Sequence, residues 1–179
     1  KCTGKLQGWI LRHGGTPLMW QPGHSLIKAK MRETGAELAG EMSGHFFFAE
    51  RWFGFDDGIY AAARLLEILA AAPEGIQELF DALPSAESTP ELKVELKEGE
   101  QHAFIERFVA KAQFEGARIN TIDGIRADWP DGWGLVRASN TTPVLVLRFE
   151  AESKERLAQI QQVFREQMLA LDPGLTLPF

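Results

Sequence analysis

Residues 84–90 read Pro-Ser-Ala-Glu-Ser-Thr-Pro, a run of small and polar residues with a proline at each end. Such a composition is typical of a linker, because it offers few apolar side chains to a core. We therefore place a domain boundary there and expect domains over residues 1–84 and 85–179. The chain has 179 residues, 45% of them hydrophobic, which is enough apolar material for two small cores.

The first domain shows helix and strand patterns in alternation. Leu6, Trp9 and Ile10 share one helical face, with Thr3 as the expected N-cap and the glycines at 14–15 as the expected end. The next expected elements are a strand over residues 16–21, a turn at Pro22-Gly23, a helix over 25–34 that Gly35 ends, and strands over 36–41 and 46–50. Asp56 is expected to cap a long helix, whose apolar face is Ile59, Ala62, Ala63, Leu66 and Leu69. A short helix is expected over 76–83. This alternation indicates an α/β domain with a mixed or largely parallel sheet. Since such a domain normally begins on a strand, we expect it to be incomplete at its N-terminus, with further domains preceding it.

The second domain has strands clustered between two helices. The expected elements are a strand over residues 92–96, a helix over 101–112, strands over 117–122, 124–129, 134–137 and 143–150, and a helix over 153–171. This order predicts a smaller α+β domain with an antiparallel sheet backed by helices.

Charge and composition exclude several classes of function. The net charge of −6 argues against a nucleic-acid partner, because such binding depends on many contacts from Lys and Arg to phosphates. No apolar run is long enough for a membrane span and no signal-peptide pattern is present, so we expect a cytoplasmic protein. A lone cysteine, Cys2, cannot form an internal disulfide, and no Cys/His spacing resembles a zinc site.

A donor-rich loop is expected between two strands of the second domain. Residues 134–143 read Gly-Leu-Val-Arg-Ala-Ser-Asn-Thr-Thr-Pro and bring together one guanidinium, three hydroxyls and an amide. A phosphate dianion needs several converging N–H and O–H donors, and arginine offers a planar two-donor fork. The alternative is a solvated turn, in which Ser, Asn and Thr occur because they favour loops.

A second polar loop is expected between two apolar strands of the first domain. Residues 40–45 read Gly-Glu-Met-Ser-Gly-His. A carboxylate can accept hydrogen bonds from two adjacent sugar hydroxyls, and glycines allow the backbone to approach the ring closely. The alternative is a turn at a strand end with an incidental histidine.

Both motifs resemble those of the α-D-phosphohexomutase family, in its phosphomannomutase/phosphoglucomutase branch. Residues 137–143 resemble the phosphate-binding loop of the family's C-terminal domain, and residues 40–45 resemble the sugar-binding motif of its third domain. The resemblance runs nearly end to end and includes residues 50–58 and the closing helix. It implies that the chain is most of the third domain followed by the fourth.

The resemblance assigns roles to residues of both loops. Those expected to contact the sugar phosphate are Arg137, Ser139, Asn140 and Thr141. Glu41 and Ser43 are expected to contact the 3- and 4-hydroxyls of the sugar, which glucose and mannose present identically. A site anchored on those hydroxyls discriminates little at carbon 2, so it would accept both sugars.

Histidines supply the candidates for acid–base catalysis. His45 and His24 lie in segments that resemble cleft-lining parts of the family, and either imidazole can titrate near neutral pH. The alternative for His24 is a residue that caps the start of its own helix. Lys1 resembles a lysine that reaches the substrate, whereas His13 and His102 are assigned to surfaces.

The implied reaction interconverts hexose 1-phosphates and hexose 6-phosphates of glucose and mannose, as an isomerase of carbohydrate metabolism. In the family, a phosphoserine in the first domain donates phosphate and a bound hexose 1,6-bisphosphate forms, with Mg²⁺ held by an aspartate-rich loop in the second domain. The full-length protein is thus expected to be a phosphoprotein that uses Mg²⁺ and glucose 1,6-bisphosphate. We expect it to be a monomer in which this chain packs with N-terminal domains one and two.

The chain alone is expected to bind a phosphosugar without turning it over. Neither a Ser-His motif nor an Asp-Gly-Asp-Gly-Asp loop occurs in its 179 residues, so no metal ligand is expected here. Phosphoryl transfer depends on positioning and on neutralising charge, which the donor and the metal supply. The alternatives are a fragment of a phosphoglucosamine mutase, which the methionine at position 42 disfavours, and a non-catalytic phosphosugar-binding module.

Overall fold

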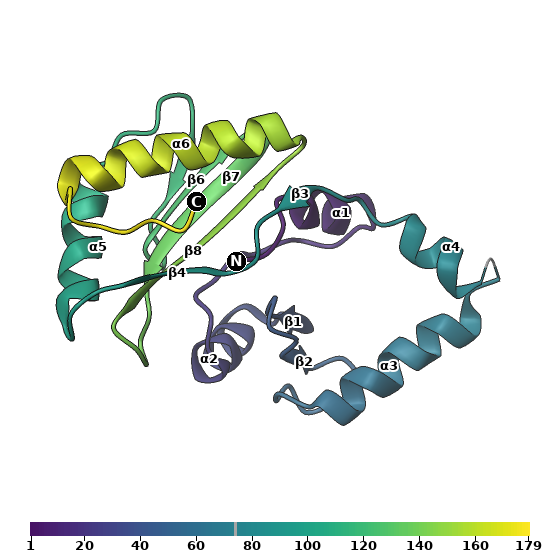
Figure 1. The fold of residues 1–179 in the computed structure, drawn as a ribbon. Coiled ribbons are helices and arrows are strands. Elements are labelled where there is room, and N and C mark those ends of the chain that lie inside the picture. Colours follow the sequence, from purple (N-terminus) through teal and green to yellow (C-terminus); the bar gives the residue numbers. More distant parts are fainter. Residues whose placement is uncertain (74) are drawn as a thin grey trace. The chain divides into compact units, whose positions relative to one another are not determined.

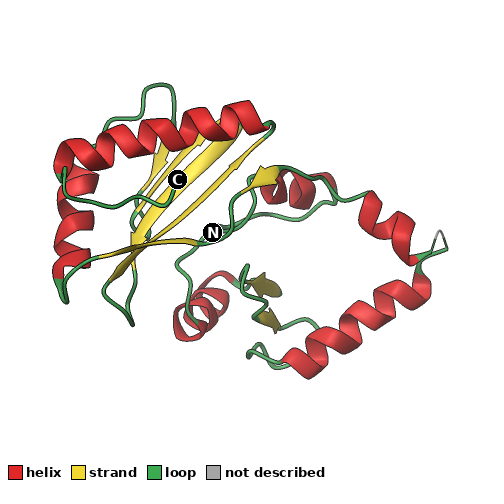
Figure 2. Cartoon of the chain, viewed as in Figure 1, coloured by secondary structure: helices red, strands yellow, loops and turns green. Residues whose placement is uncertain are grey.

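The computed structural model describes residues 1–73 and 75–179, and the chain forms two units, residues 1–85 and 86–179. The division lies one residue beyond the boundary expected from the linker. Figure 1 labels the elements of each unit, and Figure 2 distinguishes their helices, strands and loops. In the described residues, no helix is long and apolar enough to cross a membrane.

Short elements make up the first unit. They are α1 (Lys5–Arg12), α2 (His24–Thr34), β1 (Leu38–Gly40), β2 (Phe46–Phe48), α3 (Gly58–Ala71) and α4 (Ile76–Asp81). Gly35 ends α2 as expected, in the left-handed conformation with φ 71°, and its N–H donates to Met31 O at 2.8 Å.

Strands β1 and β2 pair antiparallel, with Leu38 opposite Phe48 and Gly40 opposite Phe46. The alternation of helices and strands predicted a mixed or largely parallel sheet, and the strand pair that this unit forms in the described residues is antiparallel. Only residues 41–45 connect the strands, and a loop that short reverses the chain, whereas parallel pairing needs a crossover of about a dozen residues or more.

Residues 16–21, expected as a strand, have no regular secondary structure. A strand satisfies its backbone N–H and C=O groups on a neighbour, and among the described residues no strand pairs with this segment. Instead, Lys30 of α2 places its ammonium 4.2 Å from the centre of the Trp20 ring. The segment is therefore a loop.

The core of the first unit is small. Ile27 and Met31 of α2 pack with Phe47 of β2, and Ala36 and Ala39 lie against them. Helix α3, all of which is described, has no buried residue. Its expected apolar face is exposed, with Ile59 at 87% and Leu66 at 64% of their possible exposure.

A sheet with helices on one face forms the second unit. Its elements are β3 (Glu87–Ser88), β4 (Leu92–Glu95), α5 (Glu100–Lys111), β5 (Arg118–Asn120), β6 (Ile125–Trp129), β7 (Gly132–Ala138), β8 (Val144–Ala151) and α6 (Lys154–Leu171). Within the described residues the strand order is β3-β8-β7-β6-β5, β4 also pairs with β8, and every pairing is antiparallel. Figure 1 shows α5 and α6 over one face of this sheet, so the predicted antiparallel sheet backed by helices is confirmed.

Part of the expected linker belongs to this sheet. Glu87 and Ser88 form β3, opposite Ala151 and Glu150 of β8. Thr89 continues the attachment, because its hydroxyl accepts the N–H of Phe149 at 3.1 Å. The polar composition of residues 84–90 therefore reflects a solvated edge strand as well as a connection.

Helix α6 packs closely on β7 and β8. The core holds Phe149 and Leu147 of β8 with Ile160, Phe164 and Met168 of α6, each fully buried. Glycines at 132 and 134 let the helix approach: a Cβ at Gly134 would lie 2.4 Å from the Phe164 ring. The tight layer holds β7 and β8 in register, and with them the loop that joins the two strands.

Candidate functional site

The donor-rich loop connects β7 to β8, as the sequence predicts. Ser139 N donates to Val144 O at 3.0 Å, and Val144 N donates to Thr142 O at 2.8 Å, so the loop closes on the ends of both strands. The Ser139 hydroxyl accepts the N–H groups of Thr141 and Thr142, each at 3.3 Å. Residues 139–142 are thereby folded into a compact turn of the kind that Ser favours.

Ser139 organises this loop from within. Its side chain is buried, 7% exposed, and its Oγ lies 3.0 Å from the Thr142 hydroxyl. Asn140 and Thr141 are exposed. The Thr141 hydroxyl also lies 3.5 Å from Ser139 Oγ. The predicted direct contact of Ser139 with a phosphate stays a prediction.

Arg137 lies near the end of β7, opposite Val146 of β8. Its Nε donates to Asp123 Oδ2 at 2.6 Å. Asp123 was missed in the sequence, where it occupies the gap between two expected strands. An Asp-Gly pair between two apolar runs predicts a hairpin turn, but the partner of its carboxylate follows only from the pairing of β6 with β7.

The second polar loop is the hairpin turn between β1 and β2. Glu41 N donates to His45 O at 2.9 Å, and Gly44 N donates to Glu41 O at 3.0 Å. Gly44 adopts φ 90°, a conformation that glycine reaches without strain. Ser43 is exposed at the tip of this turn.

The Glu41 carboxylate connects the hairpin to the start of α2. Its Oε1 accepts the N–H of Gly23 at 3.2 Å, which brings residues 22–24 beside the hairpin. His24 is the first residue of α2 and the N-cap position belongs to Gly23, contrary to the alternative that His24 caps its helix. The His24 ring instead lies 3.3 Å from the Ser25 hydroxyl. Glu41 thus bonds the backbone of Gly23, next to His24, and the backbone of His45, and we refer to these neighbouring residues as one local cluster.

His45 is paired with the carboxylate of Asp56, a residue that the sequence predicted to cap α3. His45 Nδ1 lies 2.7 Å from Asp56 Oδ2, and Asp56 is brought there by a bridge to Phe47 of β2. Asp56 was predicted to cap α3, but the capping residue is Asp57, whose Oδ1 accepts the Tyr60 N–H at 2.9 Å. A carboxylate on Nδ1 orients an imidazole so that Nε2 faces outward, as in histidines that transfer protons.

The predicted site residues are divided between the two units. Glu41, Ser43, His24 and His45 belong to residues 1–85, and the loop with Arg137 belongs to residues 86–179. Lys1 is half-buried and precedes α1. Its substrate contact stays a prediction.

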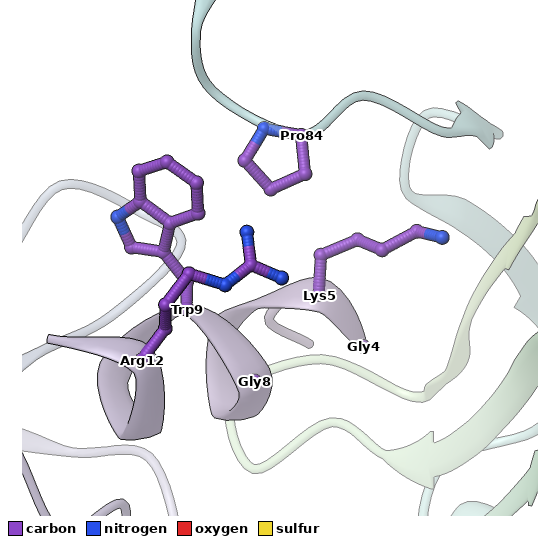
Figure 3. A pocket seen from close by; sticks show the side chains of 6 residues that line it. All are labelled: Gly4, Lys5, Gly8, Trp9, Arg12 and Pro84. Atoms are coloured by element: carbon purple, nitrogen blue, oxygen red, sulfur yellow. The ribbon is translucent and has the colours of Figure 1, made fainter.

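A cavity along α1 lies apart from these residues. It measures about 250 Å³ and is lined by Gly4, Lys5, Gly8, Trp9, Arg12 and Pro84. Figure 3 shows the Arg12 guanidinium between Trp9 and Lys5, facing Pro84. No predicted site residue lines this cavity, so it is not part of the candidate site. In residues 1–73 and 75–179, no three His, Cys, Asp or Glu side chains gather as metal ligands do.

Family models match both units of the chain. Residues 1–86 match the alpha/beta/alpha domain III of phosphoglucomutase/phosphomannomutase, and residues 91–167 match the C-terminal domain of the same proteins. The chain belongs to the phosphoglucomutase/phosphomannomutase family. The hairpin of residues 40–45 falls in its domain III, and the loop after Arg137 falls in its C-terminal domain.

Relatives extend this assignment. The chain is 58% identical to a phosphomannomutase/phosphoglucomutase of Pseudomonas aeruginosa over 100% of its length, and 55% identical to a phosphoglucomutase of Neisseria gonorrhoeae over 99%. It spans 39% of the length of either relative. A solved structure of a phosphoglucomutase/phosphomannomutase family protein from Burkholderia thailandensis is 56% identical in sequence and superposes with a TM-score of 0.91. The match covers 99% of this chain and 38% of the Burkholderia chain.

Proposed function

We propose that this chain is the sugar- and phosphate-binding part of a hexose phosphate mutase. The observation that carries the proposal is the loop of residues 137–142, in which a guanidinium adjoins a compact turn with exposed Asn140 and Thr141 side chains. Charge-assisted donors of this kind recognise a phosphate monoester. Membership of the family, whose relatives are named phosphomannomutases and phosphoglucomutases, supports this substrate class.

In this proposal the hairpin of residues 40–45 binds the sugar. The Glu41 carboxylate accepts hydrogen bonds from ring hydroxyls, with Ser43 at the tip of the same turn. His45, oriented by Asp56, holds or moves a proton at Nε2 when a hydroxyl of the sugar reacts. His24, which shares the cluster, and Lys1 are the further candidates for contact with the substrate.

The complete reaction needs groups outside these 179 residues. The proposed protein is a phosphoprotein that moves phosphate between the 1- and 6-positions of glucose and mannose through a 1,6-bisphosphate. Magnesium, when bound by another part of the protein, neutralises charge on the transferred group. Among the residues that the structure describes, no three His, Cys, Asp or Glu side chains gather to hold it. We therefore propose that this chain alone binds the substrate and does not turn it over.

The test is a titration of the isotope-labelled chain with glucose 1-phosphate, followed by amide chemical shifts. The proposal predicts saturable shifts in residues 137–142, which Arg137→Ala abolishes. Arg118→Ala, on the same sheet, serves as the matched control and leaves the shifts intact. Unchanged spectra with the wild-type chain, or normal binding by the Arg137 variant, would contradict the proposal. Stronger binding of glucosamine 6-phosphate than of mannose 1-phosphate would instead favour a phosphoglucosamine mutase.

A further inference from the structure

We propose that Asp123 is a positioning residue for phosphate binding, holding the Arg137 guanidinium by Nε so that its two Nη nitrogens face the ligand. The inference rests on the proposed function of the loop. Asp123 Oδ2 accepts from Arg137 Nε at 2.6 Å. Among the described residues, none accepts a hydrogen bond from either Nη. The aspartate therefore occupies one edge of the guanidinium and leaves the other edge available.

The turn that carries Asp123 is built against Arg137. Asn120 Oδ1 accepts the Ile122 N–H at 2.9 Å, which bends the chain as it leaves β5. Gly124 follows with φ 76°, and a Cβ there would lie 2.2 Å from Val136 O and 2.7 Å from Arg137 Cα. Only glycine permits so close an approach to β7. The position of Asp123 is thus set by backbone contact as well as by its own ion pair.

This arrangement selects one mode of phosphate binding. A guanidinium can bind two oxygens through Nε and one Nη, or through both Nη nitrogens. Asp123 takes Nε, so the phosphate is left with the pair of Nη nitrogens. Holding the long side chain in advance removes much of the entropy cost of ordering it on binding.

Charge and positioning predict opposite effects when Asp123 is neutralised. On charge alone, replacing the aspartate by asparagine removes a negative group near a dianion, and binding should become tighter. If the aspartate positions the arginine, binding should become weaker, by roughly three- to tenfold, the equivalent of one immobilised side chain. The sign of the change therefore decides between the two effects.

A matched control lies at the opposite end of the same hairpin. Asp131, in the turn between β6 and β7, places Oδ2 2.9 Å from Arg156 Nε. This pair is also an Asp–Arg ion pair through Nε, although it lacks hydrogen-bond geometry, and the register puts it at the far end of β7 from residue 139. Asp131→Asn removes a comparable ion pair from the same unit without touching the loop.

The experiment measures the dissociation constant of inorganic phosphate and of glucose 1-phosphate by the same shift titration. We expect Asp123→Asn to weaken the binding of both ligands three- to tenfold, Asp123→Glu to restore part of the loss, and Asp131→Asn to leave the binding of both unchanged.

In an Arg137→Ala background, Asp123→Asn should have no further effect. Should Asp123→Asn unfold the chain, Asp123→Glu decides: the longer side chain displaces the carboxylate and should weaken binding, and wild-type binding by Asp123→Glu would overturn the positioning role. Normal or tighter binding by Asp123→Asn, with Arg137→Ala still defective, overturns the positioning role alone. Wild-type binding by Arg137→Ala overturns the proposed function as well.

Discussion

His45 Nδ1 lies 2.7 Å from Asp56 Oδ2, so the imidazole of the β1–β2 hairpin is held by a carboxylate eleven residues further along the chain. With the neutral imidazole, Nδ1–H donates to the carboxylate and Nε2 is left as the acceptor. The pair therefore fixes both the ring orientation and the tautomer of a candidate proton-transfer group.

Replacing Asp56 should remove the preference of the neutral His45 ring for the Nδ1–H tautomer. In Asp56→Ala, the neutral His45 ring should populate both tautomers, because the carboxylate that favours Nδ1–H is gone. Long-range ¹H–¹⁵N correlations of the ring nitrogens report the populations. Asp57→Ala is the control, since it removes the neighbouring carboxylate and should leave the His45 tautomer unchanged. An Asp56 variant with one dominant Nδ1–H tautomer would show that the pair does not orient the ring.

Replacing Asp57 should weaken α3 instead. Asp57 accepts the Tyr60 N–H at 2.9 Å and the Trp52 Nε1–H at 3.1 Å. Loss of an N-cap costs about 0.5–2 kcal/mol. Amide exchange should therefore speed up in the first turn of α3 in Asp57→Ala, and much less in Asp56→Ala. Equal acceleration in the two variants would contradict the assignment of Asp57 as the cap.

Close packing at Gly134 predicts a stability effect in the second unit. A methyl group there would lie 2.4 Å from the Phe164 ring and 2.9 Å from Phe149. Overpacking of this kind costs about 1–3 kcal/mol, so Gly134→Ala should lower the free energy of unfolding by that amount in urea. The same substitution should cost less in a Phe164→Leu background, because the smaller side chain leaves room. Additive effects of the two substitutions would argue against a clash at this contact.

Acid should weaken the ion pairs that connect residues 50–51 to α3. Arg51 donates to Glu67 at 2.9 and 2.7 Å, and this hydrogen bonding lowers the pKa of the Glu67 carboxyl below its ordinary value of 4.5. A carboxyl with a lowered pKa stabilises the folded state above its unfolded-state pKa, and the contribution is lost as the pH falls through the folded-state pKa.

The wild-type chain should therefore lose more thermal stability than Glu67→Gln between pH 7 and pH 3. The effect should be modest, because the pair is exposed to solvent and salt screens it. Thermal unfolding followed by circular dichroism at each pH checks this. Parallel pH profiles of the two proteins would contradict the contribution of Glu67.

Local signals in the sequence predict most of the second unit. Ser153 before α6 caps that helix, and its side chain accepts the Arg156 N–H at 3.1 Å. Runs of apolar residues at strand spacing mark β6, β7 and β8, and the polar segment after Arg137 marks the loop between β7 and β8. These features depend on neighbours in the sequence or on one hairpin, so a single sequence suffices to find them.

Other features depend on contacts between distant segments. Residues 16–21 have the composition of a strand, but no strand among the described residues pairs with them. Asp56 and Asp57 are adjacent and chemically identical, and only the bridge between Phe47 and Asp56 assigns one to His45 and the other to the helix. Asp123 likewise acquires its partner through the pairing of β6 with β7.

The most direct test of the account compares three ligands on the labelled 20.0 kDa chain. Inorganic phosphate should shift the amides of residues 137–142 and leave residues 41–45 unchanged, whereas glucose 1-phosphate should shift the amides of both loops. Glucose without phosphate should leave residues 137–142 unchanged. Absence of any shift in residues 137–142 with saturating glucose 1-phosphate would contradict the claim that this loop binds the phosphate of a phosphosugar.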